Sequence, residues 1–287
     1  MTLENYLKEH YSPDTAKLYS RDIEIYVESH PAAATAVYKD ITNYVGALRQ
    51  RYNKPATISR ILSSIKVYYD YLCSEEIRND NPAKAIKLRD QITRDIQLQD
   101  LFTAEELENL LNRRERYNNL DYRNKVLISL LIYQALHPGE IETLTIENIN
   151  LATGSVYIKS TNKTNSRTLQ LKPNQILLFY QYINEMRSKL LNSKSSNSLL
   201  IGIRGGVMSG KDITKHIKRS FKQLYPNRKV NAQTIRQSVI TNLLKQGHDL
   251  SLVQVFAGHK NPSSTEKYKQ SEIETLKAAV NKYHPRQ

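Results

Sequence analysis

The stretch Gly258-His259-Lys-Asn-Pro-Ser-Ser-Thr-Glu-Lys-Tyr268, near the end of the 287-residue chain, follows a helical pattern that opens on Gln233-Thr-Ile-Arg236. An arginine and a histidine, each able to hold a phosphate oxygen, therefore precede a tyrosine that lies nine positions after the histidine. A phenol is a usable nucleophile, and a guanidinium and an imidazole can share the charge of the non-bridging oxygens. This set suits covalent attack on a phosphodiester and needs no metal ligands.

Basic side chains exceed acidic ones by a wide margin. The chain has 42 Lys and Arg against 28 Asp and Glu, a formal net charge of +14 at pH 7. An excess this large favours a polyanionic partner, with nucleic acid ahead of an anionic membrane surface. The alternative is that the lysines only make the surface soluble.

Other compositional features exclude several classes of protein. The single cysteine, Cys73, excludes a disulfide within the chain and fits a reducing compartment. No apolar run reaches the about 18 residues of a membrane span, and the N-terminus lacks a signal-peptide pattern. The remaining histidines show no metal-ligand spacing, and Gly202–Gly206 indicates a turn rather than a phosphate-binding loop. The sequence predicts a cytoplasmic protein with no membrane partner, metal or cofactor.

Residues 1–85 show helical periodicity throughout. A long helix is expected after Pro55, with weaker helical patterns over 13–28 and 40–52. Its apolar residues recur at spacings of three and four, which predicts one buried stripe: Ile58, Ile61, Leu62, Ile65, Tyr69 and Leu72. The charged stretch 86–101 has little apolar periodicity, and we interpret it as a linker.

Residues 102–270 predict a second domain of mixed structure. Thr103 and Glu106 form a capping-box pattern at its start. Apolar and polar residues alternate on both sides of Thr161–Asn165, which predicts a small β-hairpin between helices. A second capping pattern, Ser263 to Glu266, predicts that Tyr268 lies in or beside a short helix.

With these residues the chain resembles the tyrosine recombinase, or phage integrase, family, in which an arginine, a Gly-His pair and a tyrosine close the active site. The resemblance spans nearly the whole chain. It implies a mainly α fold with a small β-sheet or hairpin, in which an N-terminal helical core-binding domain and a mixed α/β catalytic domain clamp DNA. It also implies site-specific cleavage and exchange of double-stranded DNA through a 3′-phosphotyrosyl intermediate.

The resemblance assigns roles to individual residues. Tyr268 is the expected nucleophile, Arg236 holds two phosphate oxygens, and His259 bonds a non-bridging oxygen. We expect the cationic form of His259 to be favoured by the C-terminal end of the preceding helix. Lys163, at the hairpin tip, is expected to protonate the leaving 5′ oxygen, with Lys159 on the strand as the competing candidate.

Two positions depart from the family pattern. His137, after Ala135 and Leu136, stands where the family places its first arginine, and Gln233 replaces a histidine. Losing one transition-state contact costs about 3 kcal/mol. We therefore expect the rate of cleavage to depend on whether another residue compensates for that contact. A different reading is that His137 only caps the helix that begins at Pro138.

Four basic residues are predicted to contact DNA. Arg60 and Lys66 occupy polar positions on the long N-terminal helix, where an outward solvated face is the alternative. Arg167 and Lys159 lie on the hairpin. Arg167 could substitute for the missing first arginine, although a hairpin phosphate contact fits it better.

The C-terminal stretch 271–287 is expected to form a helical tail for subunit contacts. Its apolar stripe lies among charged residues: Ile273, Leu276, Val280 and Tyr283. The resemblance implies a synaptic tetramer on DNA, whereas packing on its own domain is the alternative for the tail.

We therefore expect a recombinase or integrase of bacterial or mobile-element origin, bound at the nucleoid. A catalytically weakened DNA-binding relative with an accessory or regulatory role is the main alternative. A topoisomerase-like enzyme without a specific site is a third reading.

Overall fold

The computed structural model describes residues 1–90 and 100–268, and the chain divides into two compact units, Met1–Arg94 and Asp95–Gln287. Within the stretch expected to be a linker, 86–101, Ile86 is buried in the core of the first unit, and the carboxylate of Asp100 accepts a hydrogen bond from the amide of Lys229. The predicted tail, 271–287, lies outside the described residues. No helix among the described residues is long and apolar enough to cross a membrane.

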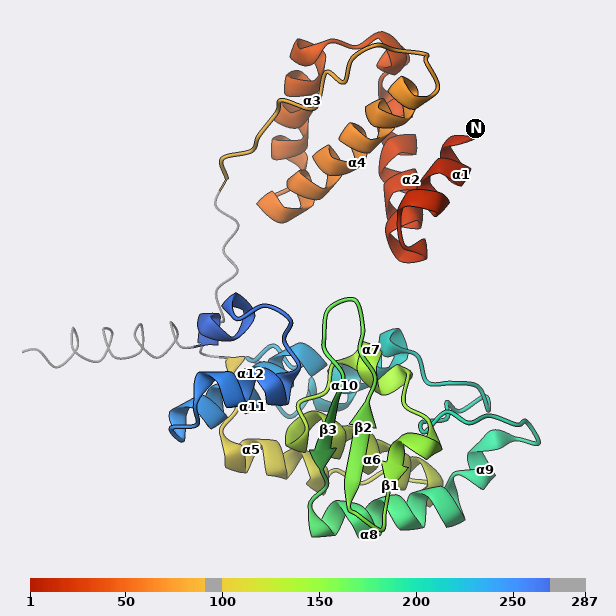
Figure 1. The fold of residues 1–287 in the computed structure, drawn as a ribbon, viewed down its shortest axis with the longest axis vertical. Coiled ribbons are helices and arrows are strands. Elements are labelled where there is room, and N and C mark those ends of the chain that lie inside the picture. Colours follow the sequence, from red (N-terminus) through yellow and green to blue (C-terminus); the bar gives the residue numbers. More distant parts are fainter. Residues whose placement is uncertain (91–99, 269–287) are drawn as a thin grey trace, which may run out of the picture. The chain divides into compact units, whose positions relative to one another are not determined.

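Four helices form the first unit (Figure 1): α1 (Leu3–His10), α2 (Pro13–Ser29), α3 (Tyr38–Arg51) and α4 (Pro55–Ser74). Proline occupies the first turn of α2 and of α4, where its missing N–H leaves no helical bond unmade. Every member of the predicted stripe on α4 is buried, so the helix and its orientation are confirmed. The hydroxyl of Tyr69 lies 2.6 Å from that of Tyr26 and donates to the carbonyl of Ala33.

Helices surround a small sheet in the second unit (Figure 1). Its longer elements in chain order are α5 (Ala104–Asn109), α6 (Asn118–Tyr133), α7 (Pro138–Glu142), β1 (Ile149–Asn150), β2 (Ser155–Ile158), β3 (Arg167–Gln170), α8 (Pro173–Gln181), a π-helical turn (Tyr182–Met186), α9 (Ser188–Leu191), α10 (Gly210–Phe221), α11 (Ala232–Lys245) and α12 (Leu250–Ala257). The expected capping box at Thr103 and Glu106 is present at the start of α5.

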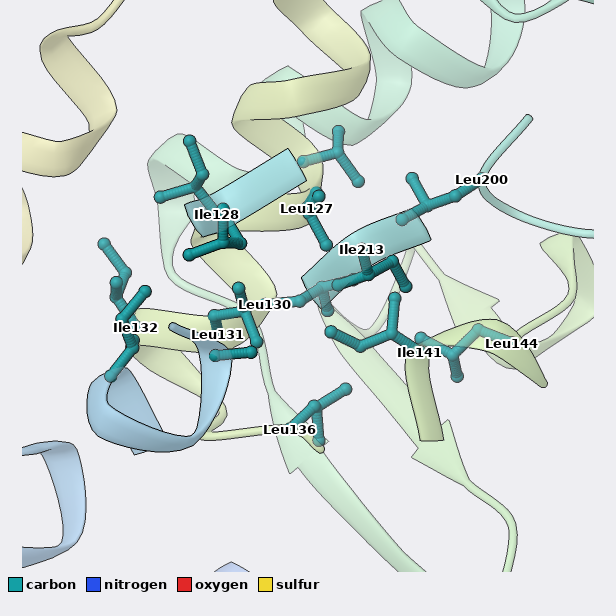
Figure 2. Close-up of a cluster of buried hydrophobic side chains, with 14 of the residues drawn as sticks. Leu127, Ile128, Leu130, Leu131, Ile132, Leu136, Ile141, Leu144, Leu200 and Ile213 are labelled. Atoms are coloured by element: carbon teal, nitrogen blue, oxygen red, sulfur yellow. The ribbon is translucent and has the colours of Figure 1, made fainter. Parts of the chain in front are cut away.

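Helix α6 forms the centre of this unit. It packs against α8 and α11, and nine of its residues are buried. Figure 2 shows its apolar side chains gathered with Ile141 of α7 and Ile213 of α10. A helix that is apolar on most of its surface is typical of a core position. Residues of α7, α10 and α11 thus share one hydrophobic core with α6, which fixes the positions of these helices relative to one another.

The sheet has three antiparallel strands in the order β1-β2-β3. Val156 pairs with Leu169, and Ile158 pairs with Arg167. Val156 and Ile158 are buried while Tyr157 between them is exposed, which is the alternation expected of a half-buried strand. The hairpin is confirmed, and the loop 159–166 that joins β2 to β3 projects beyond the sheet (Figure 1).

Candidate active site

The hairpin loop is bonded to the end of α12. The amide of Asn165 donates to the carbonyl of Gly258 at 2.8 Å, and Thr164 forms a β-bridge with His259. Inside the loop the amide of Thr161 donates to the carbonyl of Thr164, which leaves Lys163 exposed at the tip. Two segments almost a hundred residues apart in the sequence therefore bring Lys163 and His259 into one region.

Gly258 ends α12 in the left-handed conformation, with φ at 71°. A side chain here would be strained by the backbone and would also collide with the guanidinium of Arg167. Glycine is thus required for two reasons at the position that turns the chain into His259. Figure 1 shows α12 beside α11, which carries Arg236.

The ring of His259 is half-buried, and its Nδ1 lies 2.8 Å from the hydroxyl of Thr265. Burial, together with the positive charges of Arg236 and Arg167, lowers the pKa of His259 to about 4. The expectation that the helix end favours the cationic form is therefore wrong, because desolvation and two guanidinium groups outweigh the helix terminus. The imidazole stays neutral near pH 7.

Arg236 is buried, with 4% of its surface exposed. Its guanidinium donates to the carbonyl of Ala257 at 2.6 Å and to the carbonyl of Ala135, whose backbone is left-handed with φ at 50°. It also lies 3.7 Å from the carboxylate of Glu140. Arg236 therefore does not lie on a solvated face of α11, and its side chain is held by groups from two distant segments, 135–140 and the end of α12.

Glu140 is a site residue that the sequence analysis missed. Its carboxylate, 1% exposed, accepts from Arg167 at 2.7 Å and 3.2 Å and from the amide of His137 at 2.8 Å. Burial alone would raise the pKa of Glu140. The hydrogen bonds and positive charge of Arg167 outweigh burial and hold this pKa below its usual value. The signal was available, since Glu140 stands three residues after His137 in a capping-box pattern.

Arg167 does not lie on a free surface. The residue is buried, and beside its bonds to Glu140 its Nε donates to the carbonyl of Phe256 at 2.7 Å. These contacts weaken the case for the expected phosphate contact, because the guanidinium is already bonded inside the unit. Arg167 instead joins β3, α7 and the end of α12.

His137 caps α7, and its Nδ1 accepts the amide of Gly139 at 3.1 Å. The neutral ring must then carry its proton on Nε2, so it offers a single donor. Partial desolvation and the charges of Arg236 and Lys163 lower the pKa of His137 below 6.5. His137 therefore does cap α7, as the second interpretation predicts. Its ring is also close enough to Arg236 and Lys163 for their charges to affect its pKa.

Tyr268 is 5% exposed and packs against Ile240, Val253 and Ala257. Its ring is nearly parallel to that of His259, with 6.2 Å between the centroids. Burial raises the pKa of Tyr268, and the charge of Arg236 opposes that rise. Residues 263–268 are helical, as predicted.

The other candidates lie on the outside of their units or are already paired. Gln233 is exposed one turn before Arg236 on α11, and Lys159 is exposed just after β2. In the first unit Arg60 forms an ion pair with Asp22, and the amine of Lys66 donates to the carbonyls of Ile86 and Lys84. These two contacts weaken the case for Arg60 and Lys66 as phosphate ligands.

In the described part of the chain, no group of three His, Cys, Asp or Glu residues could hold a metal ion. The carboxylate of Glu140 instead contacts Arg167, Arg236 and the amide of His137, while the ring of Tyr268 lies beside that of His259. Such an arrangement can bind a phosphate group and present a phenol to it without a metal.

The chain is similar to known proteins over most of its length. Residues 100–274 match the phage integrase family, and residues 3–76 match the N-terminal SAM-like domain of phage integrases. The chain is 26% identical over 289 residues to tyrosine recombinase XerC of Halalkalibacterium halodurans. This match covers 98% of this chain and 94% of that protein. It is 26% identical over 295 residues to tyrosine recombinase XerD of Staphylococcus haemolyticus, with 99% and 98% covered.

The fold has a close counterpart among solved structures. The Tn1549 transposon integrase in complex with a circular intermediate DNA matches it with a TM-score of 0.70 at 15% identity, covering 96% of this chain and 99% of the other. At this identity the likeness concerns the fold alone. On the match over residues 100–274, the chain belongs to the phage integrase family.

Proposed function

We propose that this chain is a site-specific tyrosine recombinase that cleaves and rejoins double-stranded DNA through a 3′-phosphotyrosyl intermediate. The observation that carries the proposal is the convergence of Tyr268, Arg236 and His259 with the hairpin that bears Lys163. These residues come from three separate segments: α11, the hairpin loop and the stretch after α12. The buried Glu140 contacts both Arg236 and Arg167, and the hairpin loop forms a β-bridge with His259.

The hydroxyl of Tyr268 attacks the phosphorus of a backbone phosphate as its proton passes to water. The bond to the 5′ oxygen breaks, and Lys163 supplies the proton that turns this oxygen into a hydroxyl. Arg236 and the neutral ring of His259 donate to the non-bridging oxygens. Rejoining reverses these steps with another 5′ hydroxyl, and no nucleotide cofactor is needed because the ester bond energy is kept.

DNA is the partner that the chain's charge and relatives support. The net charge is +14, and the Tn1549 integrase structure contains a circular intermediate DNA. We place the action of this chain at a specific recombination site, in a synaptic tetramer at the bacterial nucleoid, for a mobile element or chromosome. Leu252 and Val255, which are 66% and 68% exposed on α12, support self-association because large apolar side chains favour a covered surface.

The test begins by selecting the bound sequence from random duplexes, followed by a nicked suicide substrate that carries it. The parental protein should form a covalent adduct that survives denaturation and disappears after protease treatment. Tyr268→Phe should abolish the adduct and leave DNA affinity nearly unchanged, because the hydroxyl serves the chemistry rather than docking.

An adduct that persists in Tyr268→Phe would remove this tyrosine from its role. Tight, sequence-specific binding by the parental protein with no adduct over the whole pH range would instead identify a DNA-binding accessory protein. Adducts without sequence preference would indicate a topoisomerase-like enzyme.

A further inference from the structure

A pocket lies in the second unit, lined by residues other than those of the candidate active site. This pocket of about 890 Å³ is bounded by α10, by residues 202–208 and by the segment from Arg113 to Arg123. Its volume falls in the range of about 300–1,000 Å³ that is typical of small-molecule sites. None of the described side chains that we assign to the chemistry lines it, so it can be tested separately from cleavage.

The pocket is strongly basic. Five basic side chains face two acidic ones, Glu115 and Asp212, around it: Arg113, Arg123, Arg204, Lys215 and Arg219. Glu115 is already engaged, since it accepts from Arg113 at 3.2 Å and from the amide of Asn124 at 3.1 Å. Asp212 accepts the hydroxyl of Ser209 at the start of α10. Both carboxylates are thus occupied, and positive charge remains in excess.

Arg123 is the buried member of this group, with 4% of its surface exposed. Its guanidinium donates to neutral acceptors, the side-chain oxygen of Asn124 at 2.8 Å and 3.0 Å and the carbonyl of Ile201 at 3.2 Å. These bonds use three of its five N–H groups. A buried guanidinium bonded only to neutral groups is costly, and an anion in the pocket would offset that cost.

His216 responds to the same excess of positive charge. It lies on α10 with Nε2 3.4 Å from the hydroxyl of Ser220. Burial and the charges of Arg123, Arg113 and Arg219 lower the pKa of His216 to about 4, although Glu115 opposes this. The imidazole therefore reports on the charge inside the pocket.

The pocket also has an apolar wall. Ile203 and Val207 line it and are 69% and 48% exposed, while Met208 is buried behind them. The intervening turn is closed by the amide of Gly202, which donates to the carbonyl of Gly206 at 2.7 Å. This matches the turn expected for the glycine-rich stretch, so phosphate binding here would depend on the basic side chains.

We propose that this pocket binds a nucleoside phosphate, with its phosphate group beside Arg123, Lys215 and Arg219 and its base against Ile203 and Val207. Basic side chains and exposed apolar side chains in one pocket match a ligand that carries both an anionic group and a flat apolar ring. This site goes beyond DNA strand exchange, which consumes no nucleotide.

The test uses the full-length chain without DNA and isothermal titration with AMP, ATP and inorganic phosphate. We expect saturable binding of one nucleotide per chain, with inorganic phosphate weaker because it lacks the base. Lys215→Ala with Arg219→Ala should weaken nucleotide binding by about ten-fold or more. The matched control, Lys218→Ala with Lys222→Ala, removes the same charge from the same end of α10 outside the pocket and should change little.

A second measurement follows the ring protons of His216 by NMR. Bound phosphate favours the charged imidazole, so the pKa of His216 should rise on adding AMP, and His216→Gln identifies the signal. Lack of saturable binding by any nucleotide would overturn the proposal, as would equal losses in the two double variants. Weaker DNA binding by Lys215→Ala with Arg219→Ala, without nucleotide binding by the parental chain, would assign the pocket to a DNA phosphate and also overturn it.

Discussion

The two units bury polar groups in different ways. In the first unit the hydroxyls of Tyr26 and Tyr69 form a buried neutral contact, and Arg60 and Asp22 form a partly buried ion pair, one charge to one. In the second unit two buried guanidiniums, Arg167 and Arg236, share the single carboxylate of Glu140. The first arrangement balances its charges, whereas the second leaves one positive charge in excess inside the protein.

This difference separates stability from function. An uncompensated buried charge destabilises a fold, so a unit evolved only for stability would avoid it. A phosphate group that enters the second unit would supply the missing negative charge. In the first unit the balanced contacts stabilise the packing of the helices. In the second unit the excess positive charge favours the binding of an anion.

The largest effect is expected from removing the shared carboxylate. Glu140→Gln leaves two buried guanidiniums side by side and should lower the free energy of unfolding of the second unit by about 3–5 kcal/mol. Asp22→Asn is the matched change in the first unit and should cost about 1 kcal/mol or less, because Arg60 can reach water. Hydrogen exchange measures the stability of each unit separately in one sample. Equal losses of stability from the two substitutions would contradict the proposed difference between the units.

Arg167 tests whether the same network also positions the reacting groups. Arg167→Lys cannot bond both oxygens of Glu140 and the carbonyl of Phe256, so the end of α12 should shift. We expect adduct formation to slow by about 10²-fold with DNA affinity nearly unchanged. Lys159→Ala, exposed on the same hairpin, should instead weaken DNA binding and reduce its salt dependence. Loss of affinity as the main effect of Arg167→Lys would restore the phosphate-contact interpretation.

His137 sets the expected pH dependence of cleavage. Because its pKa is lowered below 6.5, the ring is neutral at pH 7 to 8, and it gains charge only as the pH falls below that value. His137→Arg should therefore speed adduct formation by about ten-fold at pH 8, with a smaller gain toward pH 6. The ratio of variant to parental rate at each pH removes the pH effects that both proteins share. A normally folded His137→Ala protein that cleaves at the parental rate would contradict the assignment.

The smallest effect is a difference in acid stability. Folding lowers the pKa of His259 to about 4 from its ordinary value of 6.5, so the unfolded chain binds this proton first. The stability that the neutral ring contributes is complete above pH 6.5 and is lost as the pH falls toward about 4. His259→Gln should flatten this slope in the second unit and leave that of the first unchanged. Identical slopes before and after the substitution would exclude the effect.

Much of the fold was predictable because its signals are local. The stripe from Ile58 to Leu72 repeats with the period of a helix, and Pro55 fits only the first turn. The alternation around the hairpin has a period of two, so the strands and the loop between them were also predictable. The His259 to Tyr268 spacing placed both residues within one short segment, where the structure finds their rings nearly parallel.

By itself, then, the sequence determined the helices, the hairpin, the division into two units and the residue types that suit phosphodiester chemistry. Only the tertiary structure decided that Arg236 is buried, that Arg167 bonds Glu140 rather than facing outward, and that the ring of His259 is neutral. Periodicity reports which face of its own helix or strand a residue occupies. Burial, ion pairing and pKa depend on segments such as β3, α7 and α12, which are distant in the chain and meet only when it folds.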